Sequence, residues 1–358
     1  MRIWLKIKFV FSKISGCMFG SKMISKLFSS IIYKIKFLYY CIKNLPSLVK
    51  LSISEFREYC VNFKYKLSHL KETNFQLGIE HLYKGNLNDA IFRLQLVDKF
   101  IAPNHPPANY WLGWAYFLKN NYKKAELHLQ KSLEADKVGL QDFLLNYKNY
   151  REIPEPIWQL YRDLTANQYS NNLRNENNIH LPYSFIRNVL DKITSLPDSY
   201  NILELGSNTA LVGYEVQKRF PNGFTFIGIE SSIIMNGLVD IYYPSIKIYD
   251  QLLTISVKDF IVQNQDKFDV ILSLCGLSFT NDLITYFQDI YSKLNDNGYF
   301  AFSLPLGDNT ELSLKRKEFI FKLEDIVGAL KSTNFTVLDF SELELEKDKK
   351  YCIVMCKK

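Results

Sequence analysis

Acidic residues are absent from the first 54 positions of the 358-residue sequence, whereas lysine and arginine are frequent there. Residues 1–72 hold 14 Lys and Arg but only three carboxylates, Glu55, Glu58 and Glu72. The whole chain has a net charge of +7, so the remainder is slightly acidic. Because one strongly basic segment favours an anionic partner, we expect lipid headgroups or nucleic acid to bind near the N-terminus.

Long apolar runs are also missing. The uncharged stretches Ile14–Ser21 and Ile101–Leu118 are too short or interrupted by prolines, whereas a membrane span needs about 18–20 apolar residues. Glycine and proline, with 15 and 11 residues, are too few for a collagen-like or low-complexity chain. The 26 Phe and 23 Tyr require burial, which excludes a fully disordered chain. The sequence therefore predicts a soluble protein of two or three parts.

The cysteines form no CxxC pair and have no closely spaced histidine, so neither a metal centre nor a disulfide framework is expected. Unpaired thiols are typical of a reduced compartment, and we expect a cytoplasmic location. Two of them, four residues apart near the C-terminus, would lie on the same side of one strand as small core residues. The six cysteines are Cys17, Cys41, Cys60, Cys275, Cys352 and Cys356.

The segment Met23–Ile42 has apolar residues at gaps of three and one, which is the pattern of an amphipathic helix. Lys22, Lys26 and Lys43 fall mainly on its other side. A lysine-rich helix of this kind suits an anionic membrane interface, so one prediction is that residues 1–50 attach the protein peripherally to such a surface. The same stripe suits packing against the helices that follow, and the sequence leaves both alternatives open.

Residues 71–140 contain a pattern that occurs twice at an offset of 35. Gly78 followed by Ala90 recurs as Gly113 followed by Ala125. Small residues at these positions let two helices approach closely, and the pattern resembles the tetratricopeptide repeat, whose period is about 34. The resemblance implies two repeats with a capping helix to about residue 154. Such a stack commonly binds a protein or peptide partner or associates with itself, and the alternative is a scaffold that covers the next domain.

The sequence predicts three parts: a basic segment (1–70), the all-α repeats, and residues 155–358. In the third part, short apolar strands alternate with helices. This alternation predicts an α/β fold with a doubly wound, Rossmann-like sheet. A short charged turn, 344–350, joins the last two strands and predicts an antiparallel hairpin at the sheet edge. The expected strands are 201–205, 224–229, 252–257, 268–273, 298–303, 335–340 and 351–355.

The loop after the first of these strands has the composition of a nucleotide site. Gly206 follows the strand and would let a ligand approach the backbone at the start of the helix from Leu211 to Phe220. Glu230 ends the second strand, 26 residues after Glu204, where it would accept hydrogen bonds from a ribose diol. These residues predict a nucleoside-binding crevice between the two strands.

The segment resembles a class I S-adenosylmethionine-dependent methyltransferase, which has an acid-x-Gly-x-Gly-x-Gly loop and an acid after strand two. With the repeats upstream, residues 74–358 resemble bacterial methyltransferases that carry tetratricopeptide repeats. The resemblance implies a seven-stranded sheet, S-adenosylmethionine as cofactor and an unknown methyl acceptor. It also implies the cofactor-binding residues Glu204, Leu205, Gly206, Ser207, Asn208, Ala210, Glu230, Ser231, Ser273 and Leu274.

The loop departs from the family pattern, because Asn208 and Ala210 replace two of its three glycines. Asn tolerates a left-handed backbone and Ala is the smallest side chain, so cofactor binding is still expected. No Asn-Pro-Pro-Tyr-like motif follows strand four, so no DNA substrate is predicted. His180 is the only histidine beyond the repeats, and no catalytic residue is assigned, since methyl transfer can rely on alignment. The alternative is a catalytically inactive methyltransferase-like scaffold that acts as an interaction adaptor.

Overall fold

The computed structural model describes residues 29–36, 38, 59–62, 69–132, 134–173, 180–193, 196–220, 223–346 and 349–358. The chain divides into two compact units, Met1–Leu70 and Lys71–Lys358. In the first unit, residues 29–36 and 38 are helical, as their periodicity predicts, and Ile31, Ile35 and Leu38 are exposed. Most of the expected amphipathic segment, including residues 1–28, lies outside the described residues. Within the described part of the chain, no helix combines the length and apolar character needed to cross a membrane.

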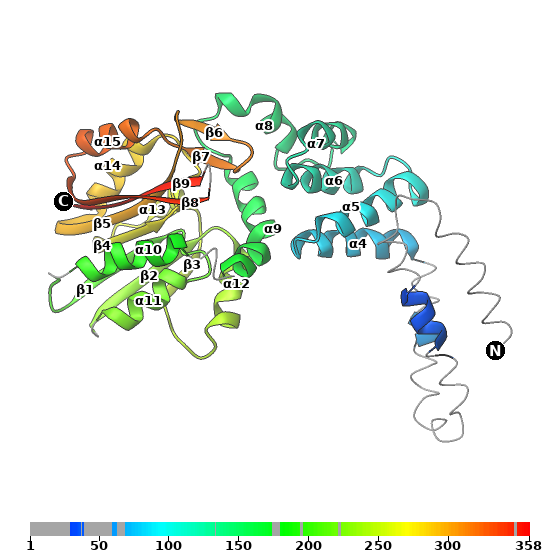
Figure 1. The fold of residues 1–358 in the computed structure, drawn as a ribbon, viewed down its shortest axis with the longest axis horizontal. Helices are drawn as coiled ribbons and strands as arrows, with labels where there is room; N and C mark the ends of the chain where they lie inside the picture. Colours follow the sequence, from blue (N-terminus) through cyan, green and yellow to red (C-terminus); the bar gives the residue numbers. More distant parts are fainter. Residues whose placement is uncertain are drawn as a thin grey trace, which may run out of the picture. The chain divides into compact units, whose positions relative to one another are not determined.

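The second unit begins with two helical hairpins (cyan in Figure 1). The turn inside the first hairpin has Gly85 at φ +75°, and the turn inside the second has Asn120 at φ +58°. Both residue types tolerate this left-handed conformation, which explains why the helices end there. The helices are α4 Leu70–Tyr83, α5 Leu87–Leu96, α6 Pro106–Leu118 and α7 Tyr122–Leu129.

Each hairpin is closed by a glycine that faces a leucine. A Cβ atom at Gly78 would lie 2.8 Å from Leu94 Cγ, and one at Gly113 would lie 2.6 Å from Leu129 Cγ. The two glycines and the two leucines are each separated by the offset of 35 that the sequence shows. The repeated pattern therefore corresponds to a repeated helix–helix contact, because only glycine leaves room for it.

Three helices connect the hairpins to the sheet: α8 Leu140–Asn146, α9 Glu155–Leu173 and α10 His180–Val189. Helix α9 lies between α4 and the sheet domain. Asn167 Nδ2 in α9 donates a hydrogen bond of 3.0 Å to the carbonyl oxygen of Tyr83 at the end of α4. The same helix also packs on α12 Ile233–Tyr242, which follows the second strand.

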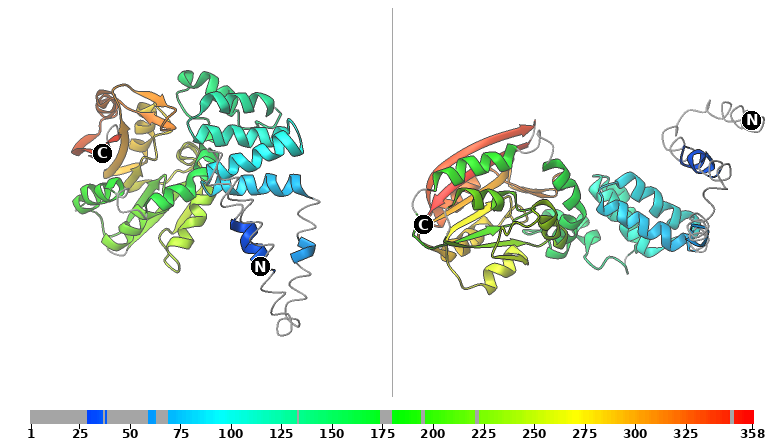
Figure 2. Two further views of the ribbon diagram at one scale, coloured as in Figure 1. Left: turned by 45° about the vertical axis from the view of Figure 1, so that its right-hand side comes forward. Right: turned by 90° about the horizontal axis from the view of Figure 1, so that it is seen from below.

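The seven-stranded sheet has the order β3-β2-β1-β4-β5-β9-β8, which confirms the seven-stranded, doubly wound prediction. Strands β1 to β5 are parallel, whereas β9 is antiparallel to both β5 and β8, so the expected edge hairpin is present (Figure 2). The strands are β1 Tyr200–Leu205, β2 Phe224–Glu230, β3 Gln251–Thr254, β4 Phe268–Leu274, β5 Leu294–Leu306, β8 Thr336–Glu346 and β9 Lys349–Lys357.

Alternate residues of each strand face opposite sides of the sheet, and helices cover both sides (Figure 1). On one side, α10, α11 Leu211–Arg219 and α12 pack on residues such as Met355. On the other side, α13 Val257–Gln263, α14 Leu283–Lys293 and α15 Leu323–Ser332 pack on the alternate positions. Cys352 and Cys356 both lie in this second core and are fully buried, as predicted.

Several details differ from the sequence prediction. The expected charged turn, 344–350, is shorter than predicted, because β8 continues to Glu346 and Glu344 pairs with Lys350 in β9. Strand β5 is longer than predicted and begins at Leu294. The third strand ends at Thr254 rather than Val257, because the Ser256 side chain accepts a hydrogen bond from Asp259 N and starts α13. A further hairpin, β6 Glu311–Ser313 and β7 Glu318–Ile320, was not expected because its strands have only three residues each. Phe319 N in this hairpin donates to the Ser278 carbonyl at 2.7 Å, which fixes the hairpin next to the loop after β4.

Candidate functional site

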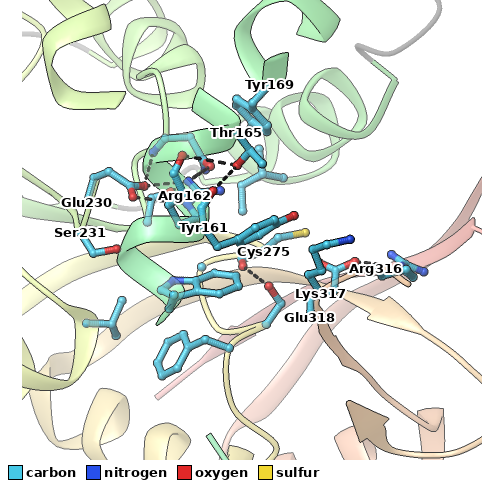
Figure 3. Close-up of a pocket in the computed structure, with 18 of the residues that line it drawn as sticks. Tyr161, Arg162, Thr165, Tyr169, Glu230, Ser231, Cys275, Arg316, Lys317 and Glu318 are labelled. Atoms are coloured by element: carbon cyan, nitrogen blue, oxygen red, sulfur yellow. Dashed lines mark hydrogen bonds and ion pairs between the residues drawn. The ribbon is translucent and has the colours of Figure 1, made fainter. Parts of the chain in front are cut away.

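A cavity of about 640 Å³ opens at the carboxyl ends of the central parallel strands. The loop after β1, the end of β2 and the loop after β4 form its floor. Helix α9 forms one wall and the β6–β7 hairpin forms another. In Figure 3, Arg162 and Glu230 lie on one side of this cavity, Arg316 and Lys317 lie on the other, and Cys275 is between them.

The loop after β1 is built from three residues in the left-handed conformation: Gly206 at φ +71°, Asn208 at +52° and Ala210 at +62°. The Asn208 side chain donates a hydrogen bond of 2.7 Å to the Gly206 carbonyl, which stabilises this backbone. A Cβ atom at Gly206 would lie 2.8 Å from the Cα atom of Gly276, in the loop after β4. Glycine at this position is therefore required by the approach of two backbones.

Glu230, the last residue of β2, points toward this loop. Its carboxylate accepts hydrogen bonds from Asn208 N at 3.1 Å and from Ser232 N at 3.0 Å, and its side chain is 2% exposed. Two backbone donors thus fix the orientation of the carboxylate that the sequence assigns to a ribose diol.

Arg162 in α9 is the third partner of this carboxylate. Its Nη2 atom lies 2.9 Å from Glu230 Oε2 and 2.5 Å from Asn208 Oδ1. The Trp158 and Tyr169 rings lie at 5.8 Å from the guanidinium carbon. Burial alone would lower the pKa of Arg162, but the facing Glu230 carboxylate raises it above its ordinary value. The guanidinium therefore stays charged, and it occupies the position where the ribose hydroxyls are expected.

Glu204 lies behind the loop instead of in the cavity wall. Its Oε2 atom accepts a hydrogen bond of 2.8 Å from the Tyr249 hydroxyl, and the residue is 1% exposed. Burial raises the pKa of Glu204 to about 8, so the carboxyl group is protonated at neutral pH. A Cβ atom at Gly228 would lie 2.7 Å from the Tyr249 ring, and Gly213 likewise leaves room for its hydroxyl group. The structure thus gives Glu204 a partner inside the domain that the sequence pattern does not indicate.

The ten predicted cofactor residues divide into two groups. Those that line the cavity are Gly206, Asn208, Glu230, Ser231 and Leu274. Those that are buried beside it, without lining it, are Glu204, Leu205, Ser207, Ala210 and Ser273. The cofactor role of each residue stays a prediction, but only the first group can touch a ligand in the cavity as it stands.

Several cavity residues carry no motif and were missed by the sequence analysis. From α9, Glu155, Trp158 and Tyr161 line the cavity in addition to Arg162. Burial, followed by the charges of Asp259 and Glu230, raises the pKa of Glu155 to about 7. The only sequence signal for this wall is a cluster of aromatic and charged residues upstream of β1.

The wall opposite α9 is formed by the β6–β7 hairpin, which contributes four charged lining residues: Lys315, Arg316, Lys317 and Glu318. Metal ligands do not gather anywhere in the described part of the chain, where no group of three or more His, Cys, Asp or Glu could hold an ion. The side chain of His180, at the start of α10, lies outside the described residues.

Residues 177–339 match the family model described as a methyltransferase domain. The match agrees with the methyltransferase domain that the sequence predicts for the C-terminal part of the chain. The search of curated proteins finds no match.

Solved structures with a similar fold include the 1,6-didemethyltoxoflavin-N1-methyltransferase of Burkholderia thailandensis, with bound 1,6-didemethyltoxoflavin and S-adenosylhomocysteine. Its identity to this chain is 14%, the coverage is 57% of this chain and 90% of that one, and the TM-score is 0.43. A second structure with a similar fold is a cyclopropane synthase of Mycobacterium tuberculosis. Its identity to this chain is 12%, the match covers 52% of this chain and 88% of the synthase, and the TM-score is 0.41. Likenesses of this size do not bear on the chemistry of this chain.

Proposed function

We propose that this chain, through the methyltransferase domain of residues 177–339, transfers the methyl group of S-adenosylmethionine to an acceptor held in the cavity against the β6–β7 hairpin. The observation that carries the proposal is the position of Gly206, Asn208 and Glu230 on the cavity floor, at the carboxyl ends of β1 and β2. In an open parallel sheet, this is where a nucleotide-type ligand binds.

The residues present suit this cofactor. Gly206 keeps the loop free of a side chain, Asn208 holds its left-handed backbone, and Glu230 is fixed by two backbone N–H groups. A carboxylate has about four acceptor positions, so a ribose diol finds further lone pairs there once Arg162 is displaced. When bound, S-adenosylmethionine supplies a methyl group on a positively charged sulfur, which is open to in-line attack.

The chain's own groups position the acceptor and exclude water. Trp158 and Tyr161 of α9 cover one side of the cavity, and Glu155 has a pKa near neutrality, which suits a group that accepts a proton from an acceptor. Burial raises the pKa of Tyr161 to about 12, so the phenol stays protonated and acts as a hydrogen-bond donor. Alignment of the nucleophile carries most of the rate in this proposal, because methyl transfer needs little further acid or base catalysis.

Arg162 regulates access to the ribose position in this proposal. A ribose diol and the guanidinium compete for the same carboxylate, because Arg162 contacts both Glu230 and Asn208. Helix α9 also contacts α4 through Asn167, so the residue that blocks the ribose position is on the helix that joins the two parts of the unit.

We further propose that the two helical hairpins are tetratricopeptide repeats that dock a protein or peptide partner. The support is the recurrence of one close contact, Gly78 with Leu94 and Gly113 with Leu129, at the period typical of that repeat.

Isothermal titration of the full chain with S-adenosylhomocysteine tests the enzyme proposal. We expect binding by the wild-type chain and at least a tenfold loss in Glu230→Gln, which keeps the size of the side chain but removes its charge. Glu324→Gln, in the exposed first turn of α15, serves as the matched control and should bind like the wild type. If the wild-type chain takes up no ligand at millimolar concentration, the adaptor alternative replaces the enzyme.

A further inference from the structure

The loop of the β6–β7 hairpin, residues 314–317, gives the cavity a wall of basic side chains opposite the Gly206 loop. Lys315, Arg316 and Lys317 all line the cavity, and the hairpin adds one carboxylate, Glu318. Figure 3 shows Arg316, Lys317 and Glu318 together on this side, across the cavity from Glu230. The wall therefore carries an excess of positive charge at some distance from the Arg162–Glu230 pair.

The Arg316 guanidinium has contacts on two sides, but one of its hydrogen-bond donors has no partner. Its Nε atom donates to Glu318 Oε1 at 2.7 Å, and its guanidinium lies over the Tyr351 ring at 4.9 Å. Its Nη2 atom is buried and has no hydrogen-bond partner in the structure. A buried guanidinium donor without an acceptor is costly, and a carboxylate or phosphate oxygen is the acceptor that its planar fork fits best.

Lys317 is the second cation of this wall and is 8% exposed. Its Nζ atom donates to Asn120 Oδ1 of the α6–α7 turn at 2.5 Å and lies 5.1 Å from the centroid of the Phe117 ring in α6, so both of these neighbours are neutral. Burial lowers the pKa of Lys317 to about 8. A nearby anion would favour the charged form and offset the cost of burial.

The backbone also holds Lys317 in a costly conformation. Its φ is +58°, in the left-handed region, and its N–H group closes the turn by donating to the Ser313 carbonyl at 2.6 Å. Glycine or asparagine usually occupies such a position, whereas here it is held by a lysine whose side chain lines the cavity. Strained positions of this kind are concentrated at binding sites.

We propose that this wall binds the anionic group of the methyl acceptor, a carboxylate or a phosphate, through Arg316 Nη2 and Lys317 Nζ. The inference rests on the proposed methyl transfer, because only that reaction makes the bound anion part of a methyl acceptor. The anion site itself can be tested without the reaction. Anchoring the acceptor at the hairpin leaves its nucleophilic atom free to reach the methyl group held on the Gly206 side of the same cavity.

The test measures binding of two simple anions, inorganic phosphate and benzoate, to the full chain by isothermal titration at constant ionic strength set with chloride. Each titration is done with the free chain and with the chain saturated with S-adenosylhomocysteine. We expect at least one anion to bind in both states, and the tighter of the two identifies the acceptor group as a phosphate or a carboxylate.

Lys317→Met and Arg316→Gln, which remove the positive charge of each side chain, should each weaken binding of that anion at least fivefold. Both should leave the affinity for S-adenosylhomocysteine within twofold of the wild type. Lys322→Met is the matched control, because Lys322 is an exposed lysine outside the cavity wall, and it should change neither affinity.

Three results would overturn the assignment: no binding of either anion, equal binding by Lys317→Met, or displacement of the anion by S-adenosylhomocysteine. The last result would place the anion on the cofactor side of the cavity. Failure of the proposed methyl transfer is distinguishable, because it appears as lack of S-adenosylhomocysteine binding while the anion still binds the hairpin wall.

Discussion

Replacing Arg162 by glutamine should make the fold less stable and the cofactor site more accessible. The guanidinium contributes one short charge-assisted hydrogen bond to Glu230, at 2.9 Å, and a longer one at 3.5 Å. A hydrogen bond to a charged group contributes about 1.5–3 kcal/mol, so we expect the free energy of unfolding to fall by about this amount. Glu230 keeps its two backbone donors and faces a cavity, so we do not expect the larger loss typical of a fully buried unpaired charge.

The same change should strengthen cofactor binding. In the proposed function, the ribose hydroxyls must first displace Arg162 from its ion pair with Glu230, so the energy of that step is lost from the affinity. Removing the competitor returns about 1.5–3 kcal/mol, which corresponds to roughly a tenfold to hundredfold lower dissociation constant. The opposite signs of the two effects distinguish competition from general damage to the structure.

Isothermal titration with S-adenosylhomocysteine measures the affinity, and urea unfolding measures the stability. Arg219→Gln is the matched control, because Arg219, at the end of α11, forms its ion pairs with Glu215 and Asp191 outside the cavity wall. Weaker or unchanged binding in Arg162→Gln would refute the reasoning, and weaker binding would make Arg162 a ligand of the cofactor.

Three further predictions follow from other parts of the chain. Gly113→Ala should cost about 1–3 kcal/mol in urea unfolding because its Cβ atom would press on Leu129, whereas Gly237→Ala, with open space around it inside α12, should be neutral or slightly stabilising. Glu204 has a pKa raised from 4.5 to about 8, so the folded state binds the extra proton and wild-type stability falls as pH rises between these values. In Glu204→Gln, the free energy of unfolding should fall by up to about 2 kcal/mol less than in the wild type between about pH 6 and pH 8, as measured by urea unfolding. The same pH dependence in both chains would contradict a protonated Glu204 in the folded state. Residues 1–50 should bind anionic vesicles in a salt-sensitive way, as measured by sedimentation, and equal binding to neutral vesicles would exclude the electrostatic contribution.

The sheet and the Gly206 loop were predictable because their determinants are local. A short apolar strand, a glycine and a helix follow one another within about twenty residues, and Glu230 ends the next strand. Asn208 adopts the left-handed backbone that its residue type favours.

The rest of the cavity wall depends on contacts distant in sequence. Arg162 precedes Glu230 by 68 residues and belongs to a helix without a motif, so the ion pair could not be inferred from spacing. Glu204 shares a motif position with cofactor-binding acids, but its partner Tyr249 is 45 residues away and draws the carboxyl group into the core. The hairpin that carries Lys317 has strands too short to give a periodic signal.

The position of β9 in the sheet determines which fragments of this protein will fold. The strand ends the chain but lies between β5 and β8, so a fragment limited to residues 177–339 would leave both neighbours with unpaired edges. It would also lack α9 and the segment before it, where Ile153 N donates to the Phe279 carbonyl beside the loop after β4. A fragment that keeps the sheet together with the α9 wall of the cavity therefore starts at Arg151 and includes β9.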